Sequence, residues 1–146
     1  MALVFEQPVR IRWSHCDPAG IVYHPQYFVI LNGLMEDFFR ECTTLSYEES
    51  VRQRFGFPIV GIRSDFCAPS RHGDECIGKV WIESIGKTSV RFALTLECEG
   101  QIRVQATETA VCVEAHGQTL EKTAIPADLR AAFEKYLSTE TLALRA

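Results

Sequence analysis

Residues 13–31 read Trp-Ser-His-Cys-Asp-Pro-Ala-Gly-Ile-Val-Tyr-His-Pro-Gln-Tyr-Phe-Val-Ile-Leu, and this stretch decides the fold. Its first part carries one carboxylate, Asp17, followed by Pro18 and Gly20, which are typical turn residues. Pro25 then stands in the first turn of a predicted helix, where its missing N–H removes no intrahelical bond. The first backbone amides of a helix have no intrahelical acceptor and lie at the positive end of its dipole. A carboxylate beside such amides is suited to attacking a carbonyl group and stabilising the resulting oxyanion.

The pattern of apolar residues differs on the two sides of this loop. Residues 4–15 alternate, with Trp13 among the apolar side chains of one face, which predicts a strand with one buried side. Residues 25–42 carry apolar side chains at helical spacing, and Phe28 and Val29 widen the stripe until the first half is apolar nearly all round. We therefore expect a long helix whose first half is enclosed, while the more charged second half emerges toward solvent.

The rest of the chain predicts one sheet and two shorter helices. Consecutive strands joined by short turns are typical of an antiparallel sheet. A sheet with one apolar face and an enclosed helix can both be buried if the sheet curls around the helix. The expectation is a single α+β domain spanning residues 1–146, with a helix at 46–54, strands near 58–69, 75–85, 88–98 and 102–114, a helix at about 126–137, and a frayed tail at 138–146.

Composition narrows the class of protein. A length of 146 residues fits one domain, and a net charge of −4 with a pI near 5.6 argues against a general nucleic-acid binder. The sequence shows no signal peptide and no apolar run long enough to cross a membrane. The six cysteines lack metal-binding spacing and are interpreted as reduced core residues of a cytoplasmic protein. Neither a metal site nor a cofactor is expected.

Each chemical interpretation of the loop has a plain structural alternative. Asp-Pro-Ala-Gly is also an ordinary turn, and the helix start that follows favours a functional role for Asp17. A triad of Ser14, His15 and Asp17 is geometrically poor because strand neighbours point to opposite faces. Cys16 is more simply a buried core residue, since a neighbouring carboxylate disfavours its thiolate. These alternatives leave Asp17 as the strongest candidate, either as nucleophile or as general base.

A second polar segment, Gly86-Lys87-Thr88-Ser89, joins two predicted strands. One glycine, one cation and two hydroxyl groups are a suitable combination for holding a phosphate. The same residues also make an ordinary polar turn. The segment is not a P-loop, because the upstream glycine is missing and no helix follows.

The segment Asp17 to Tyr27 resembles the signature of the 4-hydroxybenzoyl-CoA thioesterase family of hotdog-fold proteins. The resemblance extends through Pro58-Ile59-Val60, Gly86 to Val90 and the closing Ile125-Pro126 helix, and so covers most of the chain. It implies a curved antiparallel sheet wrapped around the long helix. It also implies a homo-oligomer, a dimer or a tetramer, built by joining sheets edge to edge.

The resemblance further implies hydrolysis of an acyl-CoA thioester at a subunit interface, with no cofactor beyond the CoA of the substrate. Asp17 would attack the carbonyl or activate water, assisted by the His24 backbone amide and by Tyr23. The residues assigned to substrate binding are Gly20, Tyr27, Lys87, Thr88 and Ser89, with the lysine turn often supplied by the neighbouring subunit. Two alternatives stay open: a non-catalytic acyl-CoA-binding module and a hotdog hydratase or dehydratase.

Overall fold

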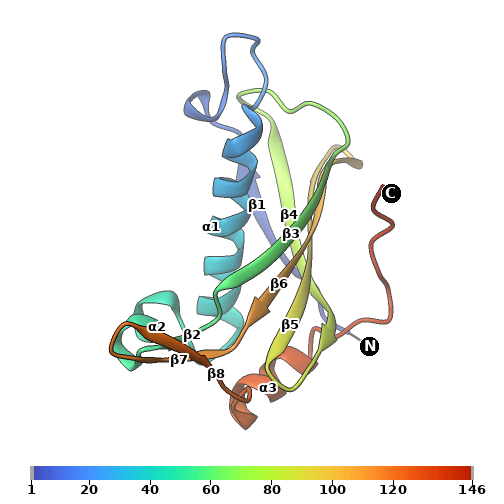
Figure 1. Ribbon diagram of the computed structural model, residues 1–146. Coiled ribbons are helices and arrows are strands. Elements are labelled where there is room, and N and C mark those ends of the chain that lie inside the picture. Colours follow the sequence, from blue (N-terminus) through green and yellow to red (C-terminus); the bar gives the residue numbers. More distant parts are fainter. Residues whose placement is uncertain (1, 146) are drawn as a thin grey trace.

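The computed structural model describes residues 2–145 and confirms the expected α+β hotdog arrangement. A five-stranded antiparallel sheet, in the order β1-β4-β5-β6-β3, curves around helix α1 (Figure 1). A smaller sheet, β2-β7-β8, lies at the lower end beside α2. The elements are β1 (Phe5–Arg10), η1 (Trp13–His15), α1 (His24–Cys42), α2 (Tyr47–Gln53), β2 (Phe55–Gly56), β3 (Ile59–Phe66), β4 (Glu75–Ile85), β5 (Ser89–Cys98), β6 (Gln101–Val111), β7 (Val113–His116), β8 (Thr119–Lys122) and α3 (Ala127–Glu134).

Helix α1 lies directly against β4. It begins after Tyr23, with Pro25 in its first turn, and its buried residues recur at helical spacing. At Gly78 of β4 the two elements approach so closely that an added Cβ would stand 2.9 Å from the methyl groups of Leu34. A larger residue at this position would force Leu34 to shift, so glycine allows the close approach of helix and sheet.

The expectation that the first half of the helix is enclosed is wrong. Val29 is 60% exposed and Phe28 is also partly open to solvent, whereas Phe38 and Phe39 in the second half are buried. The helix backbone lies closest to β4 and β1, which are at the opposite edge of the sheet from β3. Near its start the helix still reaches β3, because Tyr27 stacks on Phe66 and Phe28 meets the same ring edge to face. Val29 has no such cover and is open to solvent.

Two predicted strands are interrupted. The strand expected at 4–15 ends at Arg10, and the turn η1 carries Trp13 into solvent, where it is 78% exposed. The strand expected at 102–114 breaks at Cys112, whose N–H donates to the Thr88 carbonyl (2.7 Å) and whose carbonyl accepts from the Thr123 N–H (2.9 Å). Beyond this break the chain forms the hairpin β7–β8, which alternation did not predict because the side chains of β8 are all exposed.

The C-terminal segment, which was expected to fray, is held against the sheet by hydrogen bonds. It runs along the outer face of the sheet, opposite α1 (Figure 1). The Leu142 N–H donates to Glu83 (2.7 Å), the Arg145 N–H donates to Asp65 (2.7 Å) and the Ala143 carbonyl accepts from Gln105 (3.1 Å). These bonds reach strands β4, β3 and β6, so residues 138–145 form part of the folded domain.

One acidic residue lies on the inner face of the sheet. Glu108 of β6 stands between Phe92 of β5 and Ile62 of β3 in the strand register and is only 5% exposed. Its Oε2 has no hydrogen-bond partner among the described residues. Burial raises the pKa of Glu108, because an unpaired carboxylate is poorly solvated there.

We expect Glu108→Gln to stabilise the protein by about 1–2 kcal/mol at neutral pH, because it removes an unpaired buried charge. With a raised pKa, native Glu108 holds its proton where the unfolded chain has lost it, so the free energy of unfolding of the wild type falls as pH rises through that range. The variant lacks this decline. Urea unfolding between acidic and neutral pH measures both effects, with the exposed Glu134→Gln as control. A variant less stable than wild type at neutral pH would contradict the expectation.

Candidate active site

The loop that carries Asp17 is closed by its own backbone. Cys16 and Val22 pair as an isolated antiparallel bridge, and the Asp17 N–H donates to the Ile21 carbonyl (3.1 Å). Within the turn, Asp17 Oδ1 accepts from the Ala19 N–H at 2.8 Å. Gly20 adopts a φ of +80°, a conformation that favours glycine. The loop therefore fixes the backbone of Asp17 while its other carboxylate oxygen makes no bond to residues 2–145.

Asp17 lines a pocket of about 390 Å³. The pocket brings Asp17 together with Gly20, as the sequence predicted, and with Trp13 and His72, which the sequence did not single out. The ring centroids of Trp13 and His72 lie 4.5 Å apart, so these two side chains form one wall. The pocket thus offers a carboxylate together with an aromatic surface on which an acyl group could pack.

The turn that carries His72 is held by a network of charged groups. Asp74 accepts from the Arg71 N–H (2.9 Å) and from the guanidinium of Arg103 (2.8 Å). The Arg71 N–H and then Arg103 lower the pKa of Asp74 below its usual range. Arg103 also donates to the Pro69 carbonyl (3.0 Å), so the turn is fixed against β6.

The helix start lies next to this loop. Tyr23 caps α1, and its N–H donates to the His15 carbonyl at 3.0 Å. The His24 N–H makes no hydrogen bond to residues 2–145, as expected for the first residue of a helix. The side chains of Tyr23 and His24 are exposed and meet edge to face, with ring centroids 5.4 Å apart, and neither lines the Asp17 pocket.

Tyr27, which was assigned to substrate binding, occupies a structural position. Its side chain is buried, and its hydroxyl oxygen accepts from the Ser70 N–H at 3.2 Å. The Ser70 carbonyl in turn accepts from the Val22 N–H at 2.9 Å. Tyr27 therefore ties the segment before His72 to the helix and to the Asp17 loop.

His15 and Cys16 are less suited to catalysis than Asp17. The Nδ1 of His15 accepts from the Arg12 N–H at 2.9 Å, and burial followed by the charge of Arg12 lowers the pKa of this imidazole. His15 is thus kept neutral with one nitrogen occupied. Cys16 contacts the hydrophobic core, in line with its interpretation as a core residue, although one side of it lines the pocket.

The turn Gly86-Lys87-Thr88-Ser89 lies at the opposite end of the molecule from the Asp17 loop. In Figure 1 the β4–β5 turn lies beside α3 at the lower end, whereas the Asp17 loop is at the upper end. The backbone of the turn is fixed: the Ile125 N–H donates to the Lys87 carbonyl (3.0 Å) and Arg130 donates to the Gly86 carbonyl (2.6 Å). Lys87 is exposed, and Thr88 and Ser89 are half-buried. Within one subunit, these three residues do not join the Asp17 pocket.

Sequence reasoning missed Trp13 and His72 for different reasons. Trp13 continued the alternation of the preceding strand, so it was placed on the buried face. His72 fell in a polar turn with no motif around it. The position of Trp13 just before the Asp17 loop was a usable signal. The chain must leave the sheet to form that loop, so Trp13 need not continue the buried face of the strand.

The described part of the chain provides no obvious site for a metal and no membrane span. Across residues 2–145, no three His, Cys, Asp or Glu side chains are grouped so that they could hold a metal ion. No helix in that range has both the length and the apolar character needed to cross a bilayer. The six cysteines in the same range are all free thiols.

Comparisons with known proteins agree with this geometry. The sequence model of the thioesterase-like superfamily matches residues 11–133. The 4-hydroxybenzoyl-CoA thioesterase of Pseudomonas sp. (strain CBS-3) is 27% identical over 135 residues, covering 88% of this chain and 96% of that protein. The solved dynemicin thioesterase superimposes with a TM-score of 0.85 at 17% identity, covering 94% of this chain and 99% of that one.

A further solved structure is a D17N mutant of 4-hydroxybenzoyl-CoA thioesterase complexed with 4-hydroxybenzoyl-CoA. It has a TM-score of 0.78 at 23% identity and covers 89% of this chain and 98% of that one. The family match spans the Asp17 loop, the central helix and the whole five-stranded sheet except β1. The chain therefore belongs to the thioesterase-like superfamily and has the hotdog fold.

Proposed function

We propose that this protein hydrolyses acyl-CoA thioesters, with Asp17 as the reacting carboxylate and the His24 amide as the donor to the carbonyl oxygen. Thioester hydrolysis is supported by the family and by the named activity of the Pseudomonas relative. The observation that carries the mechanism is the Asp17 pocket next to the start of α1, where the first helical amide has no acceptor within residues 2–145. A single oxyanion donor is typically worth about 100- to 1,000-fold in rate.

The Asp17 carboxylate could act by either of two mechanisms, as a nucleophile or as a general base. Direct attack of Asp17 on the carbonyl expels the CoA thiolate and leaves an anhydride, which water then hydrolyses. Alternatively, Asp17 removes a proton from water, whose oxygen attacks the carbonyl. The C–S bond then breaks, the CoA thiolate leaves and takes up the proton from Asp17, and the free acid is released. A single turnover in ¹⁸O-labelled water separates them, because label appears in the Asp17 carboxylate only when an anhydride has formed.

The activity is tested by incubating the protein with a panel of aliphatic and aromatic acyl-CoAs and measuring release of free thiol. Turnover of at least one ester is expected. A protein that binds acyl-CoA esters without releasing thiol from any of them would instead be a binding module. Addition of water to an enoyl-CoA without thiol release would indicate a hydratase.

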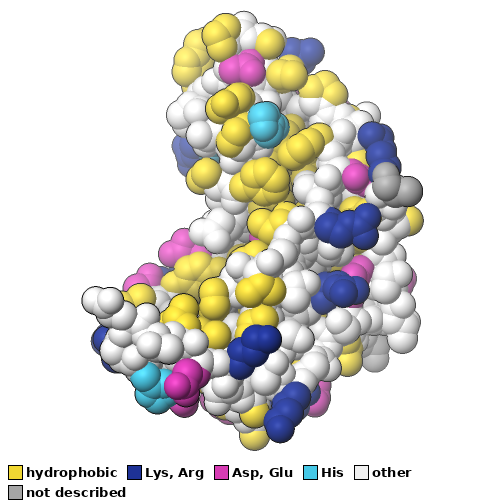
Figure 2. Space-filling model, viewed as in Figure 1, with side chains coloured by type: hydrophobic (Ala, Val, Ile, Leu, Met, Phe, Trp, Pro, Cys, Tyr) yellow, Lys and Arg dark blue, Asp and Glu magenta, His cyan; other side chains and the backbone are white. Residues whose placement is uncertain are grey.

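An exposed edge of the large sheet favours pairing with a second copy of the chain. β3 is an edge strand of the five-stranded sheet, and Val60, Ile62 and Phe66 on it are exposed. Figure 2 shows apolar side chains spread over this face of the molecule, between the upper loop and the lower hairpin. Unpaired edges of this kind are usually covered. We propose a homo-oligomer, a dimer or a tetramer, joined at this edge, and sedimentation velocity measures its state directly.

Two-fold pairing of antiparallel edges would place the upper end of one subunit near the lower end of its partner. Asp17 and the Lys87 turn lie at these two ends. In such an assembly Lys87, Thr88 and Ser89 could hold CoA phosphates for the neighbouring Asp17. This arrangement accounts for the separation of the two segments within one chain.

Lys87→Gln is expected to raise KM for acyl-CoA by roughly three- to tenfold and to leave kcat close to that of the wild type. The reason is that an exposed ammonium–phosphate contact contributes to binding more than to the chemical step, and less than a buried one would. Steady-state kinetics on one acyl-CoA measures the effect. Lys122→Gln on β8 provides an exposed control with the same charge change. An unchanged KM would remove Lys87 from the binding site.

A further inference from the structure

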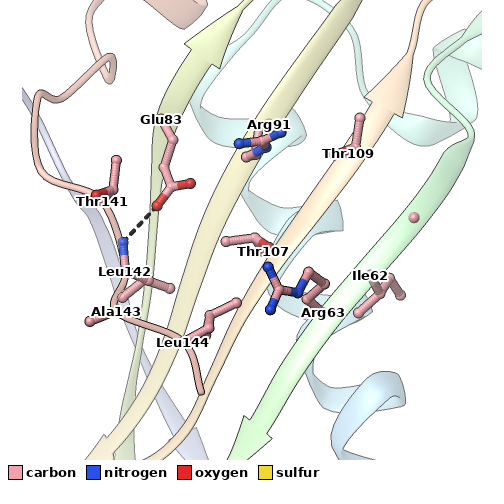
Figure 3. Close-up of a pocket in the computed structure, with 11 residues that line it drawn as sticks. Ile62, Arg63, Glu83, Arg91, Thr107, Thr109, Thr141, Leu142, Ala143 and Leu144 are labelled. Atoms are coloured by element: carbon pink, nitrogen blue, oxygen red, sulfur yellow. Dashed lines mark hydrogen bonds between the residues drawn. The ribbon is translucent and has the colours of Figure 1, made fainter. Parts of the chain in front are cut away.

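A pocket of about 640 Å³ lies on the outer face of the five-stranded sheet (Figure 3). Its floor is formed by side chains of β3, β5 and β6, and residues 141–144 of the C-terminal segment form one wall. It shares no lining residue with the Asp17 pocket, and the sheet separates it from α1. A volume of this size falls in the range of small-molecule sites, about 300–1,000 Å³.

Two guanidinium groups face this pocket from opposite sides of β6. The strand register pairs Arg91 of β5 with Thr109 and Arg63 of β3 with Thr107, so the two arginines flank a pair of hydroxyl groups. From the spacing of neighbouring strands, their Cα atoms lie about 10–12 Å apart. Figure 3 shows the Arg63 guanidinium directed toward Thr107 and the C-terminal wall.

The two arginines form no ion pair within residues 2–145, although Asp65 lies near Arg63 on β3. The pKa of Asp65 is lowered first by the Arg145 N–H and, to a smaller extent, by the charge of Arg63. Within the same range, Arg63 makes only a 3.3 Å bond to the Arg145 carbonyl. The one acidic side chain that lines the pocket, Glu83, accepts from the Leu142 N–H at 2.7 Å. Most N–H donors of the two guanidinium groups thus remain available, and arginine can bind a carboxylate or phosphate through bidentate hydrogen bonds.

The wall opposite these charges is apolar and is held in place. Leu142 and Leu144 contribute side chains to it. The hydrogen bonds of Leu142 to Glu83 and of Arg145 to Asp65 anchor the segment at both ends of this wall. A ligand in the pocket would therefore meet cations and hydroxyl groups on the sheet and leucine side chains on the tail.

We propose that this outer-face pocket binds a small organic oxyanion, with its carboxylate or phosphate group on Arg63 and Arg91 and its apolar part against Leu142 and Leu144. Both head groups accept the paired donors of arginine. The threonine hydroxyls supply further donors beside the anion. The site is separate from the Asp17 pocket and does not depend on the function proposed for it.

The test is a titration of the full-length protein with benzoate, phenyl phosphate, inorganic phosphate and the neutral analogue benzamide. Trp81 reports binding, because its indole N–H donates to the Glu140 carbonyl (3.3 Å) beside the C-terminal wall. A Trp13→Phe background leaves Trp81 as the remaining tryptophan of the two in the chain. Calorimetry provides a second, independent readout.

Saturable binding of benzoate or phenyl phosphate is expected with a Kd near or below about 1 mM, and benzamide should bind far more weakly. The tighter of the two anions identifies the head group. Arg91→Gln should weaken binding by about tenfold or more, whereas Arg52→Gln, which makes the same charge change on the exposed α2, should not. Asp17→Asn should also leave this affinity unchanged.

Three results would overturn the proposal. The first is no saturable binding of either anion. The second is equal loss of affinity in Arg91→Gln and Arg52→Gln, which would indicate a general charge effect. The third is a changed affinity in Asp17→Asn, in either direction, which would place the anion in the other pocket.

Discussion

Asp17→Asn is expected to lower kcat for acyl-CoA hydrolysis by at least about a thousandfold. An amide neither attacks a carbonyl nor removes a proton from water, and a positioned base alone typically contributes about 10²–10⁴-fold. The loop should keep its shape, because an asparagine Oδ1 can accept the bond that Asp17 Oδ1 now accepts from the Ala19 N–H (2.8 Å). Free-thiol release under saturating substrate measures the loss.

The control for this variant is Asp128→Asn on α3, which makes the same carboxylate-to-amide change outside the Asp17 pocket and outside the Lys87 turn. It should retain the activity of the wild type. Circular dichroism and acyl-CoA binding by calorimetry should be alike for the wild type and Asp17→Asn. Turnover within a few-fold of wild type in Asp17→Asn would remove Asp17 from the mechanism.

Phe38→Ala is expected to reduce the free energy of unfolding by about 3–5 kcal/mol. Phe38 is fully buried on α1, and its ring packs edge to face against four other rings, those of Phe5, Phe39, Phe92 and Tyr136. These neighbours come from β1, α1, β5 and the C-terminal region, so one truncation opens a cavity where the helix meets the sheet. For a domain of this size the loss lowers Tm by roughly 10–15 °C.

Urea unfolding followed by circular dichroism measures this loss. Phe38→Leu should give a smaller loss because it leaves a smaller cavity. Val51→Ala on the exposed face of α2 should stay within about 0.5 kcal/mol of the wild type. A loss below about 1 kcal/mol in Phe38→Ala would mean that the aromatic cluster rearranges to fill the space.

The spacing of apolar residues predicted those helices and strands that bury one face of their own. The helical spacing of the apolar residues at 25–42 gave α1 to within one residue, and the strand at 75–85 coincides with β4. The same reasoning failed where burial depends on distant partners. Val29 is exposed although Ile30 beside it on α1 is buried, and nothing in the helix itself specifies which of its apolar side chains the sheet covers. The tail at 138–145 is held by backbone bonds to distant side chains, which leave no periodic pattern.

The candidate site was predicted in part. Asp17, Gly20 and the helix start adjoin in sequence, so turn chemistry and helix capping sufficed to bring them together. Tyr27 lay at the right spacing, yet the structure directs its hydroxyl to Ser70, a contact across 43 positions of the chain that local reasoning cannot supply. The same holds for His72, which reaches the pocket only because the turn before β4 folds back onto the Asp17 loop.

The strand order has a consequence for how the chain assembles. β4, β5 and β6 follow one another in sequence and lie side by side, so they can pair by closing short loops. β1 and β3 join the two margins only after longer segments have been ordered. The β4–β5–β6 meander is thus expected to form early and to persist longest, while the edge strands β1 and β3 open first. Local opening at either edge would then leave the central strands paired.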